Sequence, residues 1–327
     1  MQGFGGSLTN YPTGWAYGTN IRGFPVLNSY PGNVLWLGNG SAIPAGCSPG
    51  NDGNPGTWTK PLATLQGAVN KSVLAGIGTI VAVKPGHSET ISSATALTMS
   101  VSGMQVVGMG WGNARPLFTL DTATTATINV TAANVGFQNC QFAANFANVA
   151  SLFTLTTAVG FSVDSCYIYD TSSILNFLAI VTTATTSNAA DMLSVTNNLV
   201  TLAATSGACP FISALGTNNA WNISANNHKA VTTGTGAWLP IATGKVLTNA
   251  LIDANRISLQ QTTGVTTGIL ITTNGSTNSG WITRNFVQAL DATTEILVTA
   301  SSGFLFSQNY YSGTADASGY LLPAADS

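Results

Sequence analysis

The residues of this chain that could perform acid–base chemistry are few. Its 327 residues include eleven carboxylates and two histidines. A glycoside hydrolase needs two carboxyl groups about 5–9.5 Å apart, and the pair closest in sequence is Asp291 with Glu295. Because Asp291 falls in a predicted turn and Glu295 begins a predicted strand, we do not expect them to act together.

A second pair of acids, Asp164 and Asp253, occupies the same position of a repeat that is described below. The two lie three repeats apart, which at about 4.8 Å per repeat separates them by about 14 Å, too far for a hydrolase. A lyase would need a basic residue beside acidic metal ligands, and Arg256 and Arg284 lie near Asp253 in the repeat. We interpret these charges instead as an exposed ion pair between neighbouring coils.

The two histidines do not predict a catalytic triad. His87 follows a Pro-Gly turn near Glu89, and neither His87 nor His228 has a nucleophile nearby in the pattern. His228 replaces an inward apolar residue of the repeat, so we expect a hydrogen-bonded core histidine.

Metal and cofactor sites are not expected either. The segment 46–58 is rich in turn residues and contains Asp52, but it lacks the spaced acids and terminal glutamate of a calcium loop. The four cysteines are scattered and form no zinc spacing, which indicates reduced thiols. No glycine-rich phosphate loop follows a predicted strand.

A six-residue pattern recurs seven times and organises the elements that carry these residues. Its first position is large and apolar, its second is polar, its fourth is Cys twice and then Asn five times, and its sixth is apolar except at His228. The seven copies are 137–142, 163–168, 195–200, 223–228, 252–257, 282–287 and 306–311. Fourth positions are 24 to 32 residues apart, a period typical of solenoids.

The fourth position predicts a column of stacked side chains inside the solenoid. Positions one, four and six point inward, so strict alternation is broken between positions three and four and the chain must bend there. We expect Asn at this bend, since Asn tolerates unusual backbone angles, with each amide donating to the next. The predicted ladder is Cys140, Cys166, Asn198, Asn226, Asn255, Asn285 and Asn309. Replacing Asn226 or Asn255 by alanine should cost about 1–3 kcal/mol each.

These patterns predict an all-β fold, a right-handed parallel β-helix of about eight coils. A second short strand precedes each copy of the pattern, as in 127–130, 152–155, 211–215, 238–241, 269–271 and 295–298. The helix expected at about 60–75, with Leu62, Leu65, Val69 and Val73 on one face, would close one end of the apolar tube. Its expected N-cap is Thr59, with Pro61 near the first helical position.

Three segments are predicted: an N-terminal arm at 1–45, a turn-rich segment with the capping helix and first strand at 46–90, and the β-helix at 91–327. The arm is rich in Gly, Pro, Asn and Tyr and could either cap the core or dock on another protein. The candidate docking residues are Arg22, Phe24, Pro25, Val26, Leu27, Tyr30, Leu35 and Trp36.

Charge restricts the partners. Only 6% of residues are charged, and the net charge is −2, so no basic surface for nucleic acid or an anionic membrane is indicated. No apolar run is long enough to span a bilayer. So little charge is unusual for a free monomer, which suggests a surface covered by other subunits.

The runs 51–57, 61–66 and 80–87 resemble the opening of pectate-lyase-like parallel β-helix proteins, and the chain from about residue 20 to its end is similar to head-associated structural proteins of tailed bacteriophages. This resemblance implies a non-enzymatic decoration or cementing protein on the outer shell of the head, assembled in the bacterial cytoplasm. The implied partners are the major capsid protein and further copies of the chain in a homotrimer. The alternative is a tailspike or fibre protein that binds or cleaves host glycans.

Overall fold

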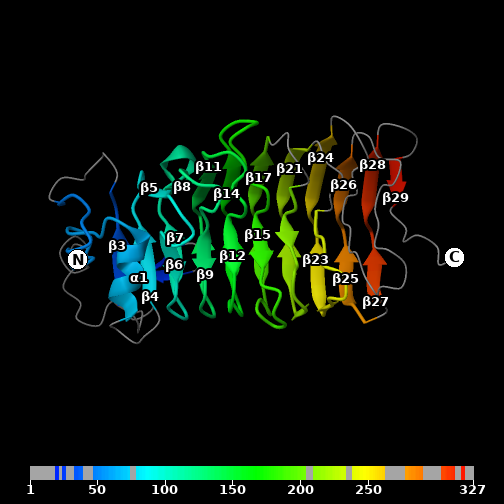
Figure 1. The fold of residues 1–327 in the computed structure, drawn as a ribbon, viewed down its shortest axis with the longest axis horizontal. Helices are drawn as coiled ribbons and strands as arrows, with labels where there is room; N and C mark the ends of the chain where they lie inside the picture. Colours follow the sequence, from blue (N-terminus) through cyan, green and yellow to red (C-terminus); the bar gives the residue numbers. More distant parts are fainter. Residues whose placement is uncertain are drawn as a thin grey trace, which may run out of the picture.

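The computed structural model of the chain is an elongated parallel β-helix, in which strands stack along one axis from β3 at one end to β28 at the other (Figure 1). The structure describes residues 19–21, 24–26, 33–39, 47–73, 79–203, 209–232, 238–261, 277–289, 303–313 and 318–320. The predicted all-β class and parallel β-helix are confirmed, with α1 as the one α-helix in these described ranges.

Two long sheets form two sides of the solenoid, and each has ten strands. Sheet 1 consists of β3 (Asn33–Leu37), β4 (Thr79–Val83), β7 (Gln105–Gly108), β10 (Gly136–Gln138), β13 (Ser162–Asp164), β16 (Ser194–Thr196), β20 (Asn222–Ser224), β23 (Ala250–Asp253), β25 (Ser279–Thr283) and β27 (Gly303–Ser307). Sheet 2 consists of β5 (Ser88–Ile91), β8 (Leu117–Leu120), β11 (Gln141–Ala144), β14 (Tyr167–Asp170), β17 (Leu199–Leu202), β21 (Asn227–Thr232), β24 (Arg256–Gln261), β26 (Phe286–Ala289), β28 (Tyr310–Gly313) and the antiparallel β29 (Ser318–Tyr320).

A third side is shorter. Sheet 3 consists of β6 (Leu97–Met99), β9 (Ile128–Val130), β12 (Phe153–Leu155), β15 (Val181–Thr183) and β18 (Ile212–Ser213). The remaining elements are β1 (Thr19–Ile21) with β2 (Phe24–Val26), β19 (Asn218–Asn219) with β22 (Leu247–Thr248), and the 3-10 turn η1 (Gly112–Ala114). Sheets 1 and 2 have ten strands each and sheet 3 has five, so the number of complete three-sided coils differs slightly from the predicted eight.

The strands before the repeat agree with the sequence pattern in part. The predicted strands 127–130, 152–155 and 211–215 contain β9, β12 and β18. The predicted strand 238–241 is wrong, since it makes only an isolated bridge between Ala214 and Ile241. The predicted strands 269–271 and 295–298 lie outside the described residues.

The core is built from the first and sixth positions of the repeat. First positions pair in register along sheet 1, from Phe137 to Phe306, and sixth positions pair along sheet 2, from Phe142 to Val287. Because a parallel ladder places equivalent side chains about 4.8 Å apart, each column packs on itself. Neighbouring phenylalanines in the early coils meet at ring-centre distances of 5.2–6.3 Å, and they are Phe118, Phe137, Phe142, Phe153 and Phe161.

The corner between sheets 1 and 2 bends at position three of the repeat, not at position four as the sequence predicted. All seven third positions have a positive φ between 53° and 57°. They are Asn139, Ser165, Asn197, Ala225, Ala254, Arg284 and Gln308. One residue in the left-handed region reverses the alternation, so the next side chain points inward again.

The left-handed corner predicts a stabilising substitution. Ala225 is exposed and has φ 55°, a conformation that Asn adopts more readily than alanine. Ala225→Asn is therefore expected to raise the free energy of unfolding by about 0.5–1 kcal/mol in urea titrations. The same change at Ala150, exposed and without a positive φ, should leave it unchanged, and equal effects at both sites would contradict the explanation.

At the N-terminal end, α1 spans Leu65–Val73, shorter than the predicted 60–75. Its buried residues are Leu65, Ala68, Val69 and Ser72. Val73 is 60% exposed, so its place on the predicted buried face is wrong, and Leu62 is buried ahead of the helix. The helix packs against β3 and β6.

Part of the predicted N-terminal arm, residues 33–37, belongs to the β-helix. Leu35 and Trp36 lie in β3, which pairs in parallel with β4 at the end of sheet 1. They therefore belong to the β-helix, and their role in docking stays a prediction. Four apolar residues in a row, 34–37, pair with the apolar residues 80–83 and extend the sheet. One hydrophobic core runs from Leu37 to Phe304, so the predicted boundaries at 45 and 90 do not separate two cores.

Candidate functional site

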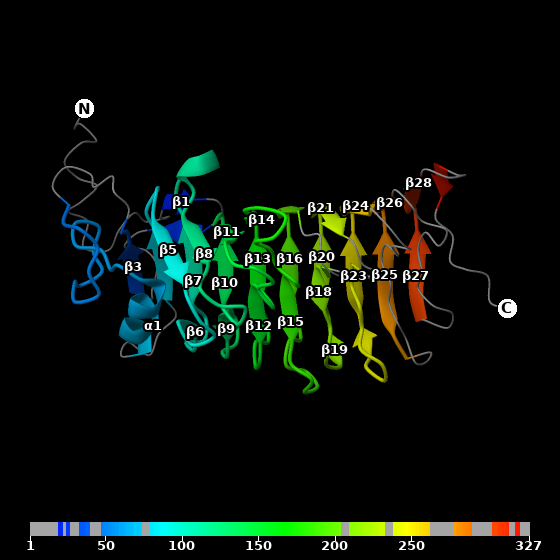
Figure 2. The ribbon, with the colours of Figure 1, turned by 45° about the horizontal axis from the view of Figure 1, so that its top comes forward.

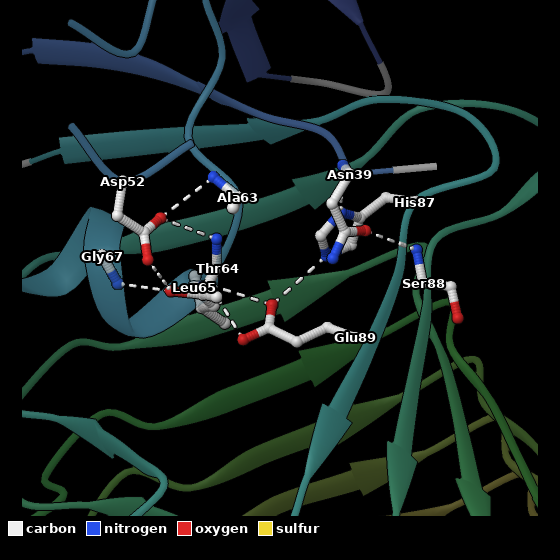
Figure 3. Close-up of polar contacts among 9 residues, drawn as sticks. All are labelled: Asn39, Asp52, Ala63, Thr64, Leu65, Gly67, His87, Ser88 and Glu89. Carbon is white, nitrogen blue, oxygen red and sulfur yellow. Dashed lines mark hydrogen bonds and ion pairs between the residues drawn. The ribbon is translucent and has the colours of Figure 1, made fainter. Parts of the chain in front are cut away.

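A cluster of buried ionisable groups lies at the start of α1 (Figure 3). Both carboxylate oxygens of Glu89 accept a hydrogen bond from the Leu65 backbone N–H, at 3.0 and 2.9 Å. This N–H belongs to the first turn of α1 and has no partner within the helix. The carboxylate also lies at the positive end of the helix dipole. Glu89 therefore fixes the helix to sheet 2.

His87 is oriented by the same cluster and has no free nitrogen. The Asn39 backbone N–H donates to Nδ1 of His87 at 3.1 Å. Nδ1 is thus an acceptor, so the proton is on Nε2, which donates to Glu89 Oε2 at 3.2 Å. The Asn39 side chain in turn accepts from the Ser88 N–H. A base needs an available lone pair near substrate, and this histidine lacks one.

Asp52 completes the junction between the turn-rich loop and α1. Its Oδ1 accepts from the backbone N–H groups of Ala63 and Thr64, both at 2.9 Å, and its Oδ2 accepts from Thr64 Oγ1 at 2.7 Å. Thr64 Oγ1 accepts from the Gly67 N–H and is the N-cap, not Thr59. A Cβ at residue 67 would lie 2.3 Å from Asp52 Oδ1, so any other residue there would displace the carboxylate from these hydrogen bonds. No group of three His, Cys, Asp or Glu residues that could hold a metal ion occurs in the described ranges.

The clamp on α1 predicts a measurable contribution to stability. In Glu89→Gln, the helix start and His87 would lose a charged acceptor, so the free energy of unfolding should fall by about 1–2 kcal/mol. Urea unfolding of Asp121→Asn provides the control, because that acid-to-amide change lies between strands, away from α1, and should cost less than about 0.5 kcal/mol. Equal losses in both variants would contradict the clamp.

Asp164 is surrounded by hydrogen-bond donors and is not poised as a proton donor. It accepts from Asn197, Thr196, Ser165 and Gln138 at 2.7–3.2 Å. Burial raises the pKa of Asp164, but these four hydrogen bonds lower it by more, so the pKa lies below the usual range. The side chain stays ionised and links neighbouring coils at the corner.

Asp253 forms the predicted ion pair between neighbouring coils, and its partner is Arg284. Arg284 Nε donates to Asp253 Oδ1 at 2.8 Å, and a second guanidinium nitrogen donates to Oδ2. These contacts raise the pKa of Arg284. Asp164 and Asp253 are separated by two intervening strands of sheet 1. Asp291 and Glu295 lie outside the described residues.

His228 is a core histidine, as its position in the repeat predicts. It is fully buried between Val200 and Ile257 in the sixth-position column, and its Nδ1 accepts from the indole N–H of Trp238 at 2.6 Å. Its ring also faces Phe211 at 5.4 Å. Within the described part of the chain, its Nε2 has no hydrogen-bond partner. Burial lowers the pKa of His228 to about 3.

The asparagine ladder is continuous from Asn198 to Asn309. The Nδ2 of each of the first four donates to the Oδ1 of the next, at 2.9–3.0 Å. Each Oδ1 also accepts from the backbone N–H one coil before, and each Nδ2 also donates to a backbone carbonyl. The three inner amides, Asn226, Asn255 and Asn285, thus each accept two hydrogen bonds and donate two.

Two cysteines extend the same column. Asn198 Oδ1 accepts from the Cys166 N–H at 2.9 Å, and Cys140 is the buried fourth position one coil earlier. Burial raises the pKa of the Cys140 and Cys209 thiols, which keeps them protonated. All four cysteines are free, and Cys47 is partly exposed. The column is a structural support without reactive groups.

The docking residues of the predicted arm are described only in part. Arg22, Leu27 and Tyr30 lie outside the described residues, and Phe24, Pro25 and Val26 form strand β2 of a short hairpin with β1. Trp36 packs edge-on against Trp58 at 4.7 Å. Lys84 extends over the Trp58 ring and donates to its backbone carbonyl. Trp36 thus supports the end of the β-helix.

One surface feature was not predicted from the sequence. Three large apolar side chains lie side by side on the outer face of sheet 1, where Leu251 pairs with Trp281 and Trp281 with Leu305. They are 38%, 53% and 54% exposed, and Phe286 at the start of β26 in sheet 2 is 42% exposed. We define these four residues as the apolar corner patch.

The patch lies on the last coils of the β-helix, where β23, β25 and β27 run side by side next to β24, β26 and β28 (Figure 2). A sequence signal exists for it. The residue before the first repeat position is Ser162, Ser194 and Asn222 in the middle coils, and it is apolar in the last three. This position points outward, so the large apolar residues there form an exposed apolar patch.

No family model matches the chain, and no curated protein does. Three solved structures are similar in fold. A rhamnogalacturonan lyase is 11% identical with a TM-score of 0.42, and the match covers 89% of this chain and 90% of that one. The GH136 lacto-N-biosidase from Eubacterium ramulus is 10% identical, with 85% and 68% covered and a TM-score of 0.43.

The pectin methylesterase from Aspergillus niger is 13% identical, with 88% and 93% covered and a TM-score of 0.37. All three names are those of enzymes. At these identities and TM-scores, however, the similarity carries no argument about activity.

Among the described residues, none of the helices has the length and apolar character of a membrane span.

Proposed function

We propose that this chain is a non-enzymatic structural protein of a tailed-phage virion, a decoration or cementing protein that binds the outer shell of the head. Its proposed partners are the major capsid protein and other copies of the chain, arranged as a homotrimer. The proposal places the chain on the head surface, after assembly in the bacterial cytoplasm. The class of protein is what the resemblance of the chain from about residue 20 to its end implies, while the opening runs 51–57, 61–66 and 80–87 resemble the fold class alone.

The observation that supports this proposal best is the use of the buried ionisable groups. Glu89 and His87 hold the start of α1, Asp170 accepts from two backbone N–H groups, and Asp253 pairs with Arg284. Enzyme sites hold such groups ready for substrate, with perturbed pKa values and free valences. Here the four named side chains bind the chain itself, as in a framework built for rigidity. His228, whose Nε2 has no partner in the described part of the chain, is enclosed in the core, where no substrate would reach it.

The low number of charged residues supports binding to other proteins through shape and apolar contact. Charged residues are 6% of the chain, and one charged pair at the corner, Arg284 with Asp253, is internally neutralised. Large, lasting protein interfaces are depleted in charged residues and enriched in aromatic ones. A protein that cements a shell needs such an interface, since it must stay bound when the virion moves between different solution conditions.

The alternative is a tailspike or fibre protein that binds host glycans. The exposed rings of Trp281 and Phe286 favour it, because aromatic faces can stack on sugars. The described carboxylates do not: Asp164 and Asp253 are separated along sheet 1 by two strands and are occupied by neighbouring side chains.

Reconstitution tests the proposal. Purified chain mixed with heads that lack it should co-sediment with them at saturable stoichiometry, and it should release no oligosaccharide from host surface polysaccharide. Absence of binding to heads, or turnover of the polysaccharide, would overturn the structural role.

A further inference from the structure

We infer that the outer face of sheet 2 binds an extended acidic segment of a partner protein. The centre of this face is a diagonal pair of cations, Lys229 and Arg256, on the neighbouring strands β21 and β24 (Figure 1). We define Lys229, Arg256, Phe286 and Tyr310 as the basic face. The inference goes beyond the proposed function, because it concerns a class of ligand and does not depend on binding to a capsid.

The first step of the argument is that both cations are available to an external ligand. Lys229 and Arg256 are exposed, in strands whose alternate residues are buried. Neither cation has an ion-pair partner among the residues that the structure describes. Arg284 at the nearby corner differs, since both oxygens of Asp253 hold its guanidinium. The two cations of the basic face can therefore bind an anion from outside the chain.

The second step is that the positive charge of this face is not compensated by neighbouring strands. None of the described acids occupies an outward position in sheet 2, and the two acids within its described strands, Glu89 and Asp170, are buried. A second copy of the chain would present the same two cations, and like charges repel. Charge complementarity therefore favours an acidic partner over a second copy.

The third step is the spacing of the two cations. Lys229 pairs with Ser258, two residues beyond Arg256. Because strands lie about 4.8 Å apart and rise about 3.3 Å per residue, the Cα atoms of Lys229 and Arg256 are about 8 Å apart. Alternate side chains of an extended strand point the same way and repeat about every 6.6 Å. Two acids separated by one residue can therefore reach both cations, and an arginine can bind a carboxylate through two parallel hydrogen bonds.

The fourth step is the pair of rings beside Arg256. Phe286 and Tyr310 continue its row in register on β26 and β28, and they are 42% and 43% exposed. An apolar residue next to the acids of a partner would pack on these rings. Nucleic acid is disfavoured, since it is bound through many phosphate contacts, and the described part of this face offers only two cations without an acid partner. The face therefore suits a short acidic segment followed by an apolar residue.

Fluorescence anisotropy of a labelled peptide tests this inference with the purified full-length chain. The peptide has the core Asp-Val-Asp-Val-Leu, and its neutral control has Asn-Val-Asn-Val-Leu. The wild-type chain should bind the acidic peptide, and Lys229→Gln and Arg256→Gln should each raise its Kd by about three- to fivefold. Lys60→Gln removes the same charge at an exposed residue of the N-terminal loop and should leave the Kd unchanged. All three variants should keep the wild-type melting temperature.

Two results would overturn the inference. The first is a wild-type chain that binds the acidic and neutral peptides equally or not at all, or a Kd that is unchanged in both sheet 2 variants. The second is tighter binding of polyuridylate or polygalacturonate at the same concentration of negative charge, lost in both variants, which would assign the face to a nucleic acid or an acidic polysaccharide. These measurements use no heads, so failure of this inference is distinguishable from failure of the proposed function.

Discussion

Asn226→Ala is expected to lower the free energy of unfolding by about 3–5 kcal/mol. The side chain takes part in four buried hydrogen bonds, two from Asn198 to its Oδ1 and two from its Nδ2 to Val195 O and Asn255 Oδ1. Alanine would leave donors and an acceptor without partners in the interior, where water does not replace them. This expected loss exceeds the 1–3 kcal/mol inferred from the sequence, because the sequence does not show how many bonds each amide makes.

The neighbouring residue provides the control for this measurement. Asn227 follows Asn226 directly but is exposed on the outer face of sheet 2. Asn227→Ala should therefore change the free energy of unfolding by less than about 0.5 kcal/mol. Urea titration of the two variants separates the ladder from the general effect of losing an asparagine. Similar, small losses in both would show that the ladder does not stabilise the fold.

The second large effect is a loss of stability in acid that depends on His228. Burial lowers the pKa of this residue to about 3, whereas a histidine in the unfolded chain titrates near 6.5. Below pH 6.5 the unfolded chain takes up a proton that the folded chain does not accept until about pH 3. The folded state therefore loses stability as the pH falls through this window, by about 2 kcal/mol between pH 7 and pH 5.

His228→Leu isolates this contribution. Leucine cannot take up a proton and resembles Val200 and Ile257, which neighbour His228 in the same column. The free energies of unfolding of both proteins are measured at pH 7 and pH 5. Other titrating groups cancel in the difference, which should shift by about 2 kcal/mol in favour of the variant. A difference independent of pH would mean that the folded histidine takes up its proton near its ordinary pKa.

The fold was predictable because the repeat is a direct record of one turn of the β-helix. Large apolar residues at positions one and six indicate two inward strands, and the small buried fourth position indicates a column between them. The backbone angle at position three was not predictable from residue type. Ala254 and Arg284 occupy it as well as Asn197, and side chains of such different kinds give no common signal for a left-handed residue.

The contacts around α1 and the apolar corner patch could not be predicted, because a single sequence does not show which distant residues meet or which way a side chain points. Glu89 reaches Leu65 across 24 residues, and no local pattern indicates that contact. The start of α1 was placed too early because Thr59 and Pro61 are acceptable helix-start residues, while Thr64 is the one that bonds to the Gly67 N–H. The apolar corner patch had a signal in the column before the repeat, but that column becomes meaningful only when its outward direction is known.

The most direct test of the proposed function is a search for this chain in purified virions from the source of the sequence, with its copy number measured by quantitative mass spectrometry against the major capsid protein. A decoration protein should be present in hundreds of copies, in a fixed ratio to the shell subunits. A count of only a few to tens per particle would contradict decoration in favour of a spike or fibre, and absence from the particles would contradict both.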